Sequence, residues 1–171
     1  MNYLDDSIQV FKNYKALGDK TISQLNEEEI NYQPDPESNS IALIVKHLHG
    51  NMISRWTDFL TTDGEKENRH RDREFEGALK NKTELMLLWE EGWNCLFNTL
   101  HSLKEEDLGL TVFIRKEPHT VMQAINRQLA HYPYHIGQMV YVARMFRKEG
   151  WKSLSIPKGK SEEFNRKMGG K

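Results

Sequence analysis

The chain has 171 residues, a length that suits one domain spanning residues 1–171, and it carries 24 Lys and Arg against 25 Asp and Glu. This balance gives no general attraction to nucleic acids or anionic membranes, and no apolar run approaches the ~20 residues needed to span a bilayer. The first residues lack the features of a signal peptide, and the single cysteine, Cys95, excludes an internal disulfide. We therefore expect a soluble, cytoplasmic protein that binds neither nucleic acid nor membrane.

Apolar residues at helical spacing predict four long helices. The first runs from residue 3 to about residue 25 and is followed by a short capped turn at residues 26–29. The second covers about residues 41–60. A polar loop dense in charge spans residues 61–77, and its length indicates that it is either functional or mobile. Within this loop we interpret the charge run at residues 69–74 as a solvated segment, with a lid over a site as the alternative.

The third helix is expected at about residues 82–103 and the fourth at about residues 121–149, where Gly150 ends it. Between them, the β-branched and aromatic residues 111–115 predict a short strand or hairpin. The tail is expected to be irregular, but three apolar side chains could pack it back onto the helices: Trp151, Leu154 and Ile156. The pattern as a whole predicts an all-α fold, a four-helix bundle with a short hairpin before the last helix.

Two histidines in the predicted fourth helix, in the sequence His131-Tyr-Pro-Tyr-His135, are candidate metal ligands. On a helix this spacing places both rings on one face, one turn apart, where two neutral imidazoles can share a divalent metal. A third ligand would come from His47 or His49 in the second helix, and helical geometry alone does not choose between them. Pro133 removes a backbone hydrogen bond, so we expect a kinked but continuous helix, with a new helix starting there as the alternative.

The competing interpretation is that the two histidines are paired by chance. The chain contains seven histidines, and the HxxxH pattern lacks the intervening Glu of a metalloprotease. Asn51 and Arg55 fall near His47 on the second helix, and Gln138 lies near the pair on the fourth, so these three are candidates to orient ligands or substrate. No acidic residue stands at a fixed spacing from the histidines, and the catalytic residues are therefore unknown.

These motifs, in this order and at this separation, resemble the DinB/YfiT-like superfamily. The similarity rests on residues 46–48 in the second helix and 131–138 in the fourth. Three further stretches, residues 47–55, 63–66 and 151–161, resemble an uncharacterised, Bacillus-type branch of that superfamily, and the resemblance covers nearly the whole chain. It implies an antiparallel four-helix bundle with a three-histidine metal site at one end.

The resemblance also implies which residues bind the metal and what the site does. The ligands map to His47, His131 and His135, with His49 as the fallback, whereas Pro133 departs from the expected pattern. Imidazoles suit zinc, nickel, iron and copper alike. The implied function is that of a metal-dependent S-transferase or hydrolase acting on a small molecule, with a low-molecular-weight thiol such as bacillithiol as the partner. Related bundles pair, so a homodimer is expected; the alternative is a non-catalytic metal-binding or dimerising four-helix bundle.

Overall fold

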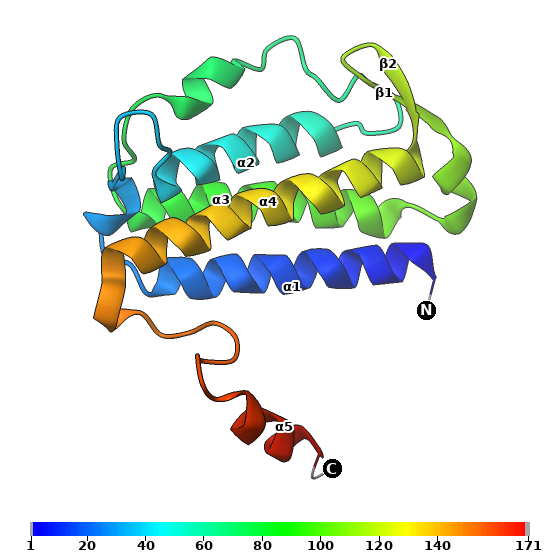
Figure 1. The fold of residues 1–171 in the computed structure, drawn as a ribbon. Coiled ribbons are helices and arrows are strands. Elements are labelled where there is room, and N and C mark those ends of the chain that lie inside the picture. Colours follow the sequence, from blue (N-terminus) through cyan, green and yellow to red (C-terminus); the bar gives the residue numbers. More distant parts are fainter. Residues whose placement is uncertain (1, 170–171) are drawn as a thin grey trace.

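The computed structural model describes residues 2–169, which form five α-helices and one small sheet (Figure 1). The helices are α1 (Tyr3–Ser23), α2 (Ile41–Trp56), α3 (Lys82–Ser102), α4 (Val121–Arg147) and α5 (Ser161–Gly169). Short 3-10 helices lie at Glu29–Asn31, Arg71–Phe75, Glu105–Gly109 and Lys148–Gly150. The fold is mostly helical, in agreement with the predicted all-α class. Across the described residues, no helix has both the length and the apolar character needed to cross a membrane.

The core lies between helices α1 to α4, which run side by side, while α5 stands apart from them at the C-terminal end (Figure 1). Helix α2 packs against α3 and α4, and α1 packs against α4 and α3. Five aromatic side chains fill the interior and are almost completely buried: Phe11, Trp56, Trp89, Trp93 and Tyr132. Burial of a large apolar side chain contributes about 1.5–3 kcal/mol, so this shared aromatic core holds α2 and α4 in a fixed relation.

The sheet is a hairpin in the predicted place, immediately before α4. Strand β1 (Thr111–Ile114) pairs with β2 (Glu117–Thr120) in antiparallel register, leaving a two-residue turn. Both turn residues have positive φ, 56° at Arg115 and 65° at Lys116, as a type I′ turn requires. The Asp63 carboxylate accepts hydrogen bonds from both backbone N–H groups, at 2.9 and 2.7 Å. The hairpin tip is therefore attached to the loop that follows α2.

The helix ends differ from the predicted ones by a few residues. Helix α2 ends at Trp56 rather than near residue 60, because Thr57 has extended backbone angles and Asp58 has a φ of 49°. Helix α4 ends at Arg147, and Lys148, with a φ of 46°, begins a 3-10 turn. Local backbone geometry at the caps, which apolar periodicity does not report, sets both ends.

The prediction of an irregular tail was wrong for its last part, which forms α5. Glu163 forms ion pairs with Lys160 at 3.3 Å and Lys167 at 2.9 Å, and such pairs at i,i+3 and i,i+4 spacing support a short helix. Trp151 packs against the core as expected, whereas Ile156 is 39% exposed.

Candidate metal centre

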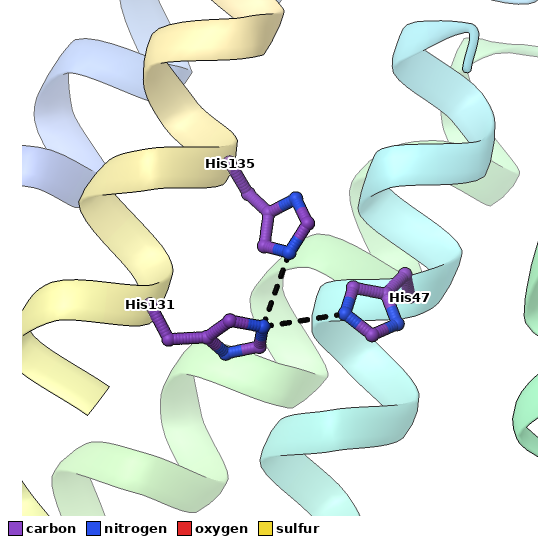
Figure 2. Close-up of side chains that lie close together, drawn as sticks. All are labelled: His47, His131 and His135. Atoms are coloured by element: carbon purple, nitrogen blue, oxygen red, sulfur yellow. Dashed lines mark hydrogen bonds between the residues drawn. The ribbon is translucent and has the colours of Figure 1, made fainter. Parts of the chain in front are cut away.

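Three histidines from two helices point their ring nitrogens at one another (Figure 2). His47 comes from α2, and His131 and His135 come from α4. The Nε2 atom of His131 lies 3.4 Å from Nε2 of His47 and 3.1 Å from Nε2 of His135. One ligand atom from each residue falls within 4.8 Å of the other two. The structure thus brings together the three histidines that the resemblance to the superfamily implies as ligands.

The pair on α4 stays on one face because the helix continues through Pro133. The expected continuity of the helix is confirmed, and the alternative of a new helix starting at this proline was wrong. The expected kink stays a prediction. Tyr132, between His131 and Pro133, connects this turn to α2. The Trp56 Nε1–H donates to the Tyr132 hydroxyl at 2.9 Å, and that hydroxyl donates to Asn51 Oδ1 at 3.1 Å. Because Tyr132 is fully buried, this chain of hydrogen bonds ties α4 to α2 beside the histidines.

On the side of each ring away from the cluster, a side-chain oxygen lies within hydrogen-bond distance of the Nδ1 atom. The partners are Glu74 Oε2 at 2.8 Å from His47, Gln128 Oε1 at 3.2 Å from His131 and Gln138 Oε1 at 2.8 Å from His135. A carboxylate can only accept a hydrogen bond, so the Nδ1 atom of His47 carries the proton.

The same tautomer follows for His135 on α4. The Gln138 amide donates to the Tyr134 hydroxyl at 3.2 Å, which leaves its oxygen to accept from His135. Neutral rings protonated at Nδ1 present a bare Nε2 lone pair to the centre.

Burial keeps two of the three rings neutral. It lowers the pKa of His131 to about 3, and the charges of His135, His47 and nearby arginines act in the same direction. It also lowers the pKa of His135 to about 4, with His47 contributing and the hydrogen bond to Gln138 opposing. Because only neutral imidazole binds a metal, both rings are available as ligands at neutral pH.

The spacing of the nitrogens fits one divalent cation. Two nitrogens that are each about 2.1 Å from a metal lie about 3.4 Å apart in tetrahedral geometry and about 3.0 Å apart in octahedral geometry. The two separations from His131, 3.4 and 3.1 Å, lie in this range, and the ligand atoms of His47 and His135 lie within 4.8 Å of each other. Lone pairs that face one another at this range repel, and a cation between them removes the repulsion. The donor set and the geometry therefore both fit a divalent metal of the kind that binds imidazole.

The charged loop contributes a wall of this site, and interpreting residues 69–74 as a solvated run was wrong for two of them. The Glu74 side chain is 10% exposed and that of Arg69 is 5% exposed. Arg69 donates to both Glu74 oxygens, from Nε at 2.8 Å and from Nη2 at 2.9 Å, while Glu74 accepts from His47. Burial opposes ionisation of Glu74, but these hydrogen bonds outweigh it and hold the pKa of Glu74 below its ordinary value. Phe75 stacks on the His47 ring, with centroids 4.8 Å apart.

Sequence reasoning missed Glu74 because nothing fixes its spacing from His47, 27 residues earlier. One signal was available in Gly50, which stands three residues after His47. A Cβ at Gly50 would collide with the Glu74 carboxylate, so the glycine lets the loop approach α2 closely. Sequence reasoning also assigned no role to Gln128, the residue whose side-chain oxygen faces His131.

The other candidates lie at different distances from the cluster. His49 is directed elsewhere, with its Nε2 atom 3.0 Å from the Glu91 carboxylate on α3. Gln138 contacts His135 directly, whereas Asn51 contacts Tyr132 instead of an imidazole. Arg55 is 3% exposed and lines a cavity of 480 Å³ that also borders the three histidines. The cavity gives a small molecule room beside the cluster.

Fold and site together define a mostly helical protein with three histidines close enough to hold a metal ion. The chain belongs to the family described as "Protein of unknown function (DUF1572)", whose model matches residues 1–160. It is similar in structure to the "conserved protein of locus from Enterococcus faecalis", solved by crystallography, with a TM-score of 0.65 and 16% identity over 85% of this chain and 97% of that one. This likeness concerns the fold alone. The comparison with curated proteins gives no match.

Proposed function

We propose that this protein is a metal-dependent enzyme that binds a divalent cation through His47, His131 and His135. The observation that carries the proposal is the convergence of three Nε2 atoms whose rings are each fixed by an oxygen at Nδ1. Among residues 2–169, no carboxylate or thiol joins this group of three. Three protein ligands beside a cavity are typical of catalytic sites, which keep positions open for water or substrate, whereas structural sites are closed by a fourth ligand.

A divalent cation in such a site lowers the pKa of water or of a thiol and so supplies a nucleophile at neutral pH. The protein's own contribution is to hold the rings. Glu74 fixes the tautomer of His47 and orients its ring, and Gln128 and Gln138 orient the pair on α4 without adding charge.

We further propose that the fold is the antiparallel four-helix bundle of the DinB/YfiT-like superfamily. Four helices lying side by side and a hairpin before α4 support this assignment (Figure 1). The resemblance to that superfamily favours thiol transfer or hydrolysis, with a low-molecular-weight thiol such as bacillithiol as co-substrate. A homodimer stays a prediction, to be tested by the mass of the particle in solution.

Elemental analysis of untagged protein tests the metal site. We expect one divalent ion per chain in the parent protein and in His49→Ala, and loss of stoichiometric metal in His47→Ala. The two histidines lie on the same helix two residues apart, so His49→Ala is a matched control. Full metal content in His47→Ala would contradict the assignment.

Calorimetric titration with bacillithiol tests the chemistry. Binding to the metal-loaded protein, with none to the metal-free protein, is expected if the thiol coordinates the ion. Equal affinity for the two forms would contradict thiol activation by the metal, and a closed site that binds no exogenous ligand would favour a non-catalytic role.

A further inference from the structure

The cavity beside the histidines has a strongly cationic lining. Five arginines border it, drawn from α2, the charged loop, the hairpin turn and α4: Arg55, Arg69, Arg71, Arg115 and Arg127. Among the described residues that border it there is no Asp or Glu. A low-dielectric recess with one sign of charge concentrates ligands of the opposite sign.

The nearby carboxylates do not neutralise the positive charge of these arginines. Glu74 is already shared between Arg69 and His47. Glu65 is shared among three guanidinium groups, at 3.1 Å from Arg69, 3.4 Å from Arg115 and 3.9 Å from Arg55. Two negative charges therefore face three arginines and one imidazole.

The remaining two arginines add to the excess. Arg71 has its ion pair with Asp72, a side chain 96% exposed, at 3.9 Å, where water screens the interaction. Arg127 is exposed on α4, and the described part of the chain provides it with no ion pair. Its guanidinium group is therefore free to pair with an anion that enters the cavity.

Arg55 is the clearest sign of a missing partner. Its side chain is 4% exposed, and its nearest carboxylate oxygen is 3.9 Å away, beyond hydrogen-bond range. Its Nε and Nη1 atoms are buried without a hydrogen-bond partner among the described residues. A buried guanidinium that is left unpaired costs far more than one that meets an anion. This residue follows Asn51 by one helical turn, so α2 presents it to the same cavity as His47.

We propose that this cavity binds an oxyanion group of the substrate, a carboxylate or a phosphate, with Arg55 and Arg127 as its charge partners. The inference deepens the proposed function: the substrate is an acid whose anionic group lies on the arginines while its reacting group reaches the cation. Guanidinium groups match both kinds of oxyanion through paired N–H donors, and the cavity of 480 Å³ has the size of a metabolite site.

Calorimetric titration of the metal-free, untagged protein with malonate and with inorganic phosphate, at low ionic strength and pH 7.5, tests this subsite. We expect saturable binding of at least one probe with one site per chain, and the preferred probe identifies the kind of oxyanion. Arg55→Gln should weaken binding about tenfold or more, because a charge-assisted hydrogen bond is lost. Arg127→Gln should weaken it about threefold, since that charge is exposed and screened.

Arg144→Gln is the matched control, because Arg144 is an exposed residue of α4 that does not border the cavity. The affinity of this variant for the anion probes should stay within about twofold of that of the parent. If Arg55→Gln fails to fold, as judged by its thermal transition, the exposed Arg127 still decides the outcome. Absence of saturable binding for both probes, or parental affinity in the folded arginine variants, would overturn the proposal. Because the titration needs no metal, a protein that binds anions but holds no ion contradicts the metal centre alone.

Discussion

The two sides of the histidine cluster are built in different ways. On the α4 side, His131 and His135 come from one helical repeat, and the neutral amides of Gln128 and Gln138, three residues before and after, hold the rings. On the α2 side, His47 is held by a carboxylate from a loop 27 residues away, which Arg69 in turn fixes. A pair of ligands on one helix can therefore take its hydrogen-bond partners from the same helix, whereas the single ligand on α2 depends on a side chain from a segment distant in the sequence.

The loop side should be the more sensitive of the two. Glu74→Gln keeps the shape of the side chain but removes its charge. Arg69 then loses one of its two carboxylate partners, and the amide can turn its N–H₂ group, a donor, toward His47. We expect the metal affinity to fall about 10- to 100-fold, as is typical when the carboxylate behind a ligating histidine is removed. Competition with a chelating dye measures the change.

Glu91→Gln is the control for that variant, because Glu91 also contacts a histidine of α2, His49, but away from the cluster. Its metal affinity should equal that of the parent. Equal losses in the two variants would show that a surface charge effect, rather than support of His47, causes the change.

The helix side depends on the anchor between α4 and α2. Tyr132→Phe removes the hydroxyl that accepts from Trp56 and donates to Asn51, and leaves two buried polar groups unpaired. The free energy of unfolding should fall by about 1–3 kcal/mol, measured by urea denaturation. Tyr134→Phe, at an exposed position on the same helix, should change it by less than about 0.5 kcal/mol. A Tyr132→Phe protein as stable as the parent would show that the buried chain of hydrogen bonds does not hold the helices.

Acid should destabilise the metal-free protein through the α4 pair. In the folded state the pKa values of His131 and His135 are about 3 and 4, whereas in the unfolded chain they are about 6.5. Below pH 6.5 the unfolded state therefore binds protons that the folded state does not.

The free energy of unfolding should accordingly be at its full value above pH 6.5 and should fall as the pH is lowered from 6.5 toward 4. Denaturation curves between pH 8 and 5 measure this slope. His131→Gln, measured without metal, should make the slope shallower, and an unchanged slope would contradict the role of this ring.

The sequence was sufficient for the features that repeat along a helix. Apolar periodicity predicted the four long helices, and the β-branched and aromatic residues 111–115 predicted the hairpin. The i,i+4 spacing predicted that His131 and His135 share a face. The sequence pattern did not distinguish His47 from His49 as the third ligand, because both lie off the apolar stripe of α2. The resemblance to a superfamily favoured His47, which is the one beside the α4 pair.

What the sequence did not predict depends on contacts between distant segments. The position of Glu74 follows from the path of the loop over α2, and its burial depends on Arg69, with which it forms a buried pair. The cationic cavity needs four segments to be assembled before its charge can be counted. A net charge of −1 over the whole chain conceals this local excess of positive charge.

The position of the bound ion tests the central claim most directly. A crystal of the zinc-loaded protein, measured above and below the zinc absorption edge, should give an anomalous difference peak about 2.1 Å from the Nε2 atoms of His47, His131 and His135. A peak at His49 and Glu91, or no peak within reach of the three imidazoles, would contradict it.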